Sequence, residues 1–160
     1  MEATFAQTPV FTDALASGAH WLMVGVCLAL VAAVVGLHYE ALERFNEWLP
    51  RLRLPKRPRV LILIVGLLIV HTIEIWIFGA VLFEVAKWPQ LGRVAGVGEL
   101  RLLDAVYLST VTFTTVGYGD LIPQGPLRLL LGIESLSGFL LVTWSASFTY
   151  LEMQRNWRVL

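Results

Sequence analysis

The sequence predicts an all-α membrane protein with three transmembrane helices and a shorter fourth helix that enters the membrane without crossing it. Of its 160 residues, 57% are hydrophobic and only 15% are charged, whereas soluble domains average about 25% charged residues. Three apolar stretches are long enough to span a bilayer, which takes roughly 20 residues. The most glycine-dense polar run, TTVGYGD (114–120), lies between the second and third stretches.

The three apolar stretches are expected to form transmembrane helices at about 20–38, 60–84 and 126–151. No Lys or Arg precedes the first stretch, so a retained helix fits better than a cleaved signal peptide, which needs a basic start. The second stretch contains His71 and Glu74, and the third contains Arg128 and Glu134. All three are therefore interpreted as spans, two of them with polar residues inside.

The basic residues indicate the orientation of these spans. Six of the 12 Lys and Arg residues lie between the first two stretches: Arg44, Arg51, Arg53, Lys56, Arg57 and Arg59. Short loops rich in Lys and Arg stay in the cytoplasm. The N-terminal segment is therefore expected outside the cell and the short tail 153–160 in the cytoplasm. The expected location of the protein is the plasma membrane. The basic loop 51–59 could also contact anionic lipids. With a net charge of zero, nucleic acid binding has no other support.

The segment after the second span contains a helical run at about 102–113. At about 1.5 Å per residue it is roughly 16 Å long, half a membrane. Glycine-rich extended backbone follows it. Irregular backbone at membrane depth is tolerated only where it is buried in protein or lines a water-filled path. The run 114–120 is therefore expected to line such a path.

This arrangement resembles the pore domain of potassium channels. The motif TVGYGD follows a half-length helix and lies between two spans, and the resemblance covers residues 60–152. It implies passive K⁺ conduction, with backbone carbonyls replacing the water of a dehydrated ion and no organic cofactor. The residues implied for this selectivity filter are Thr115, Val116, Gly117, Tyr118 and Gly119, with Asp120 at the outer mouth. A surface turn or a phosphate-binding loop would explain the glycines but not the flanking spans.

One loop supplies one carbonyl per layer of the filter, so four chains are needed to surround an ion. The sequence has one such loop, which predicts a homotetramer. The alternatives are a weakly selective cation channel and a non-conducting membrane scaffold or accessory subunit. No catalytic pairing of Ser, His or Cys is visible in the sequence, so an enzyme is not expected. No span carries the repeated arginines of a voltage sensor.

Several residues are candidates for shaping the pore. Gly138 lies about where the resembling family has a hinge glycine, although it could equally allow close helix packing. A period of 3.6 from Gly138 defines a face that is expected to line the inner cavity, and it carries Phe139, Val142, Ala146 and Tyr150. On the short helix, Val111 stands where an acid-activated bacterial relative has a glutamate, and Tyr107 is a candidate substitute partner for Asp120.

Charged residues inside a membrane are costly and face the bundle interior with partners. Counted from the ends of their spans, Glu74 and Glu134 lie at similar depths, and His71 lies one turn below Glu74. One hypothesis is a single buried cluster of these three residues with the hydroxyl of Ser109 or Thr112, which would make opening depend on pH. The alternative is that His71 and Glu74 pair with each other against the first span.

Overall fold

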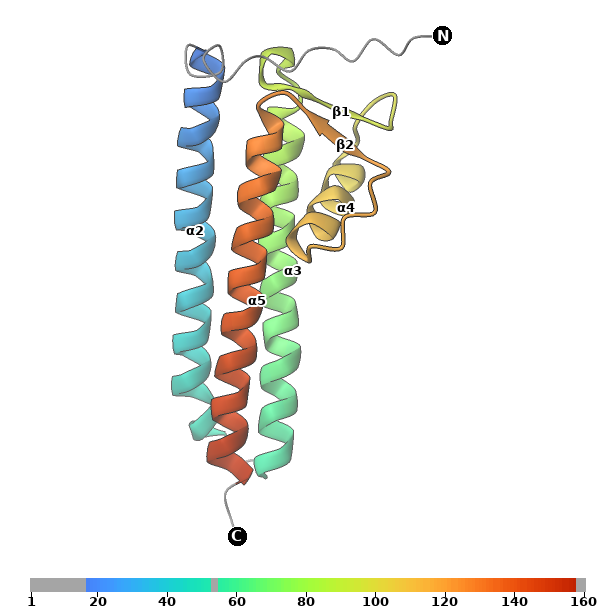
Figure 1. The fold of residues 1–160 in the computed structure, drawn as a ribbon. Coiled ribbons are helices and arrows are strands. Elements are labelled where there is room, and N and C mark those ends of the chain that lie inside the picture. Colours follow the sequence, from blue (N-terminus) through green and yellow to red (C-terminus); the bar gives the residue numbers. More distant parts are fainter. Residues whose placement is uncertain (1–16, 53–54, 158–160) are drawn as a thin grey trace.

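The computed structural model describes residues 17–52 and 55–157. The first part of the expected outside segment (1–16), residues 53–54 of the basic loop and the end of the tail (158–160) lie outside the described residues. Three long helices stand side by side in a bundle (Figure 1), and each is long and apolar enough to cross a membrane. They are α2 (Gly18–Trp48), α3 (Lys56–Val85) and α5 (Leu127–Trp157).

All three helices run further than expected, and α3 begins at Lys56, four residues before its expected start. Helix α2 continues through the sequence EALERFNEW, which contains neither Gly nor Pro, and the short 3-10 helix η1 (Leu49–Arg51) follows it. Helix α5 continues past the expected end at 151 to Trp157. Most of the expected linker between the first two spans is therefore helical, and the turn into α3 is short.

The short helix α4 (Leu102–Phe113) has the bounds expected for the half-length helix. Its first turn is capped by Asp104, whose carboxylate accepts from the backbone N–H of Arg101 at 3.0 Å. It leans against α3 and α5 near the end of the bundle at which α2 begins (Figure 1). Glycine permits one very close approach: a Cβ on Gly79 of α3 would lie 2.8 Å from the Cα of Val106.

A two-stranded antiparallel ribbon, which the sequence did not predict, joins the two ends of the re-entrant segment. Strand β1 (Arg93–Ala95) pairs with β2 (Ile122–Gln124), and the 3-10 helix η2 (Pro89–Leu91) precedes β1. The Arg93 guanidinium donates to the side-chain carbonyl of Gln124 at 2.7 Å. The predicted all-α membrane fold is confirmed, and the ribbon is a local addition that closes the segment containing α4.

Candidate functional site

The glycine-rich run has a backbone whose handedness alternates. Thr115, Gly117 and Gly119 have φ of 60°, 54° and 78°, whereas Val116 and Tyr118 between them have negative φ. Alternation of this kind gathers successive N–H groups on one side of a chain and leaves the carbonyl oxygens on the other. Glycine tolerates positive φ without a steric penalty. The motif therefore has the backbone needed for a row of oxygens that face one way.

The end of α4 holds the run on its N–H side. The N–H of Thr115 donates to the carbonyl of Thr112 at 2.9 Å, and the N–H of Gly117 donates to the carbonyl of Val111 at 3.0 Å. These bonds also satisfy carbonyls that a helix C-terminus leaves free. Because the C-terminal end of a helix is partially negative, α4 presents to the run an end that favours a cation.

The other side of the run is open. Every residue from 114 to 120 is exposed, including Val116 at 55% and Tyr118 at 72%. A Cβ on Gly117 or Gly119 would meet no atom within 4 Å. Bare backbone and an exposed valine at membrane depth need cover from protein or a water-filled path. A single chain does not supply that cover.

The Asp120 end of the run is fixed by the pairing expected between Tyr107 and Asp120. The Tyr107 hydroxyl donates to the Asp120 carboxylate at 2.8 Å, which confirms the expected partner. This hydrogen bond, together with desolvation and the negative charge of Asp120, raises the pKa of Tyr107 above its usual value of 10.0. The neutral phenol therefore remains the donor throughout the physiological pH range.

The candidate cavity residues lie along α5. A Cβ on Gly138 would lie 2.2 Å from the carbonyl oxygen of Phe113, the last residue of α4. This close approach of α5 to the end of α4 is what the packing alternative for Gly138 requires. Helix α5 is continuous through this position. The face expected to line a cavity is exposed in the single chain at Phe139, Val142, Ala146 and Tyr150.

The polar residues inside the spans form two groups instead of the single cluster considered above. In the first group, the Ser109 hydroxyl lies within hydrogen-bond distance of a Glu134 carboxyl oxygen and 2.9 Å from the carbonyl of Ile75. One hydroxyl has one proton and can donate to only one of these acceptors. Both contacts are hydrogen bonds if Glu134 is protonated and donates to Ser109, which then donates to Ile75. Glu134 is fully buried, and its second oxygen has no partner among the described residues.

The second group surrounds Glu74. Its two carboxylate oxygens lie 2.8 Å from Nδ1 of His38 and 2.8 Å from Nδ1 of His71. This is the alternative arrangement, in which Glu74 and His71 pair against the first span. No hydrogen bond links Glu74 to Glu134 in the part of the chain that the structure describes, and Thr112 contributes its carbonyl to the glycine-rich run.

Sequence reasoning did not include His38 in this group. The signal was nevertheless present, because the buried residues of α2 recur every three or four positions and His38 continues their series. They are Met23, Cys27, Leu30, Val34, His38 and Leu42. A polar residue on the buried face of a membrane helix implies a partner on another helix.

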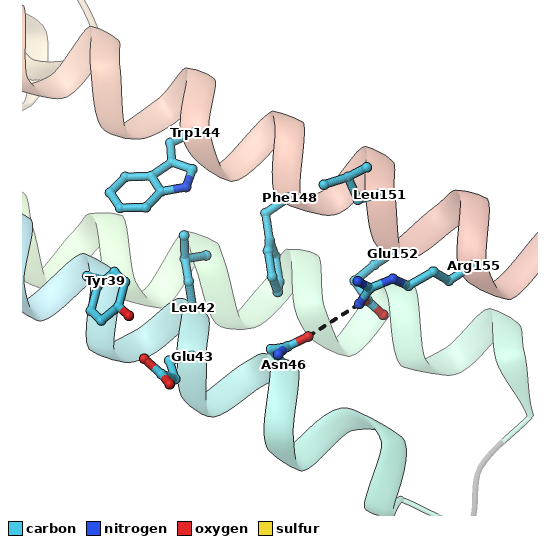
Figure 2. A pocket seen from close by; sticks show the side chains of 9 residues that line it. All are labelled: Tyr39, Leu42, Glu43, Asn46, Trp144, Phe148, Leu151, Glu152 and Arg155. Atoms are coloured by element: carbon cyan, nitrogen blue, oxygen red, sulfur yellow. Dashed lines mark hydrogen bonds and ion pairs between the residues drawn. The ribbon is translucent and has the colours of Figure 1, made fainter.

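A pocket of about 330 Å³ lies between α2 and α5 (Figure 2). Tyr39 and Trp144 stand at one end of it, and a hydrogen bond of 3.3 Å from Arg155 to the side chain of Asn46 crosses the other end. The indole of Trp144 also lies 5.5 Å from the imidazole of His38, centroid to centroid. The complete lining is Tyr39, Leu42, Glu43, Asn46, Trp144, Phe148, Leu151, Glu152 and Arg155.

Membrane-length helices around a half-length helix and an open, glycine-rich run are the features of a channel subunit. The model of the ion channel family matches residues 61–154, and the chain belongs to this family. The match covers α3, α4, the glycine-rich run and most of α5, and leaves α2 outside. Membership of a channel family also bears out the expectation that the chain is not an enzyme.

Two curated relatives are potassium channels of rice. The chain is 33% identical over 96 residues to Two pore potassium channel a of Oryza sativa subsp. japonica. These 96 residues cover 60% of this chain and 23% of the relative. It is 40% identical over 68 residues to Two pore potassium channel b of the same plant. These 68 residues cover 42% of this chain and 18% of the relative. The chain thus matches less than a quarter of either relative's length. No solved structure matches the chain.

Proposed function

We propose that the chain is one subunit of a potassium-selective channel, in which residues 115–119 of four identical chains form the selectivity filter. The observation that carries the proposal is the alternation of φ along this run, a pattern that is expected to turn consecutive carbonyls to one side of the backbone. The sequence TVGYG and the potassium channels among the relatives support K⁺ as the ion.

The proposed mechanism is passive permeation through the filter. Carbonyl oxygens of Thr115, Val116, Gly117 and Tyr118, together with the Thr115 hydroxyl, replace the water around K⁺. These oxygens are neutral dipoles, so an ion is held strongly enough to enter and weakly enough to leave. The C-terminal end of α4 adds a partially negative potential at the inner end of the run. Asp120, held by Tyr107, stands at the outer mouth.

Four chains are proposed because one chain leaves the filter open on the carbonyl side. The exposed side chains of Val116 and Tyr118 and the empty space beside Gly117 and Gly119 leave room for neighbouring subunits and for the ion path. In a closed ring with fourfold symmetry, the open side of the filter is covered in the same way in all four chains. The exposed face of α5 at Phe139, Val142, Ala146 and Tyr150 would then line the inner cavity.

The proposed location is the plasma membrane, with the N-terminus outside and the C-terminus in the cytoplasm. The re-entrant segment and the connection from α2 to α3 lie at opposite ends of the bundle (Figure 1). The basic residues gather at that connection, and basic loops stay in the cytoplasm. In this orientation the filter opens outward, and the basic segment 51–59 is proposed to bind anionic lipids of the inner leaflet.

The experiment compares K⁺ and Na⁺ flux through purified protein in liposomes, with Gly119→Asp as the variant and Gly98→Asp as the control. Gly119 has φ of 78° in the filter, whereas Gly98 is an exposed loop glycine with no atom within 4 Å of an added Cβ. Gly119→Asp is expected to abolish K⁺ flux and keep the tetramer, and Gly98→Asp to keep both.

The other outcomes have defined meanings. An unchanged preference for K⁺ over Na⁺ in Gly119→Asp would refute the filter assignment. Equal K⁺ and Na⁺ flux through the wild type would indicate a weakly selective cation channel. A wild-type tetramer that carries no flux in either salt would indicate a scaffold or an accessory subunit.

A further inference from the structure

Four polar side chains from three helices form a closed cycle of contacts inside the bundle. Glu74 of α3 holds Nδ1 of His38 from α2 and Nδ1 of His71, each at 2.8 Å. The Nε2 atoms of both histidines converge on the hydroxyl of Ser145 from α5, at 3.3 Å for His38 and 3.0 Å for His71. Each residue of this four-residue cycle therefore contacts two others. His38, His71 and Glu74 each use two different polar atoms, and Ser145 uses its one hydroxyl for both contacts.

The cycle is enclosed by apolar and aromatic groups. His38 and Glu74 are fully buried, Ser145 is 6% exposed and the His71 side chain is 14% exposed. The two imidazoles stack with their centroids 5.3 Å apart. The groups that face the cycle are His38 from α2, His71 and Glu74 from α3, Phe113 from α4, and Trp144 and Ser145 from α5. The other buried acid, Glu134, is bonded to Ser109.

Counting protons shows what the cycle requires. Four hydrogen bonds need four protons, one in each contact. Two neutral histidines supply two protons and the Ser145 hydroxyl supplies a third, whereas a carboxylate supplies none. One further proton is needed, and it can reside on an imidazole or on Glu74 without changing the count. With that proton the four residues together are neutral. Without it, one Nε2 lone pair faces the serine oxygen, and the cycle has a net charge of −1 inside the membrane.

From this count we propose that His38, Glu74, His71 and Ser145 form a single buried site that binds one exchangeable proton. The proton belongs to the cycle as a whole, as expected for strongly interacting titratable groups. Its binding completes the contacts that hold α2 against α3 and α5. None of the four residues belongs to the proposed filter, and α2 lies outside the region that matches the ion channel family.

A divalent metal ion is the competing ligand for this set of side chains. Two imidazoles and a carboxylate are common zinc ligands, and the donor atoms of His38, His71 and Glu74 lie within 4.8 Å of one another. However, each nitrogen and carboxylate oxygen of the cycle already has a hydrogen-bond partner. A divalent ion would also leave a net charge of +1 in the apolar interior. A proton satisfies both constraints.

The proton has consequences for the pore because the cycle is close to the base of the filter. The His71 imidazole lies 5.9 Å from the Phe113 ring, centroid to centroid, and Phe113 is the last residue of α4. As pH rises, the proton is lost and the buried negative charge remains uncompensated, which is costly in an apolar environment. The attachment of α2 is therefore strongest at low pH and weakens as pH rises.

The variant Glu74→Gln provides a matched test, because glutamine closes the same cycle without the extra proton. Its amide donates to Nδ1 of His71, and its carbonyl accepts from Nδ1 of His38. His71 then donates through Nε2 to Ser145, which donates to Nε2 of His38. All four contacts are satisfied, with both histidines neutral and of opposite tautomer. The shape is preserved, and the proton site is removed.

The experiment is nitrogen NMR of ¹⁵N-histidine-labelled protein in bilayers from about pH 5 to about pH 9, the range that brackets histidine titration. His20→Gln is included throughout, so that only His38 and His71 remain of the three histidines. For the otherwise wild-type chain we expect one more proton in the cycle at low pH than at high pH, seen either as one doubly protonated ring or as two neutral rings of opposite tautomer. At high pH both rings should be neutral with the proton on Nδ1. Glu74→Gln should give two neutral rings of opposite tautomer at every pH.

Two further measurements distinguish a proton site from a metal site and cover a variant that does not fold. Should Glu74→Gln fail to fold, Ser145→Ala removes the shared hydroxyl, and the proton should then be lost at lower pH than in the wild type. Metal analysis of the purified protein should find no tightly held divalent ion. Two neutral rings with unchanged tautomers at every pH in the wild type, or one zinc ion per chain, would overturn the proposal. Neither result depends on ion conduction, so the proposed channel function is tested separately.

Discussion

Replacing Gly138 with alanine tests how the pore helix is held. An added Cβ would lie 2.2 Å from the carbonyl oxygen of Phe113 and 2.8 Å from its ring, where ordinary contact begins near 3.4 Å. The nearest atom is backbone, so α4 and α5 must move apart. Overpacking of this kind costs about 1–3 kcal/mol. Because only Thr114 separates Phe113 from the filter, the displacement should reach Thr115 and reduce the preference for K⁺ over Na⁺.

Gly132→Ala is the matched control on the same helix. A Cβ at Gly132 meets no atom within 4 Å in the single chain, and Gly→Ala in a helix interior is favourable by about 0.8–1.0 kcal/mol. Thermal dissociation of the purified tetramer and K⁺ over Na⁺ flux in liposomes are measured for both variants. Gly138→Ala should dissociate at a lower temperature than the wild type, and Gly132→Ala at the same or a higher temperature.

The result also separates packing from a hinge. A glycine that served only as a hinge would leave Gly138→Ala at least as stable as Gly132→Ala and would change the fraction of open channels without changing selectivity. Equal stability of the two alanine variants would therefore refute the packing account of this glycine.

Three further changes have expected outcomes. Tyr107→Phe removes the hydrogen bond to Asp120 and should lower the selectivity for K⁺ over Na⁺ in flux assays. The wild type should keep its selectivity up to about pH 10, because the raised pKa of Tyr107 preserves the phenol as donor. A loss of selectivity at lower pH would contradict the role of this hydrogen bond. Glu134→Gln keeps a donor towards Ser109 and should change the free energy of unfolding by less than about 1 kcal/mol; a larger loss would indicate an ionised acid. In a cysteine-free background, an impermeant thiol reagent added outside should label Gly98→Cys and not Glu43→Cys, and the reverse would invert the topology.

The long helices could be predicted from the sequence because the membrane imposes one requirement on each of them. About twenty apolar residues are enough to identify α3 and α5, and the half-length of α4 follows from where apolar sequence gives way to glycine. The extension of α2 beyond residue 38 was harder to place, because a helix that leaves the membrane becomes polar and loses the apolar signal. The ribbon could not be predicted, since strands of three residues are too short to show an alternating pattern.

The polar contacts inside the bundle depend on how the helices are rotated, which sequence spacing alone does not determine. The pair His71 and Glu74 lies three residues apart on one helix, so spacing was sufficient to suggest it. The contact of His38 with Glu74 joins residues 36 positions apart, and it forms only because α2 packs on the α3 side that carries Glu74. Similar depth in the membrane suggested that Glu74 and Glu134 would meet, but depth does not specify the face of a helix.

The reversal potential of purified channels in a planar bilayer tests the central claim of K⁺ selectivity most directly. With a tenfold K⁺ gradient, and Na⁺ added to the low-K⁺ side until the total cation concentrations are equal, a K⁺-selective filter formed by residues 115–119 predicts a reversal potential close to the K⁺ equilibrium value, about 59 mV in magnitude. Gly98→Asp should give the same value. A reversal potential near zero under these conditions would show that the pore does not distinguish K⁺ from Na⁺ and would contradict the account.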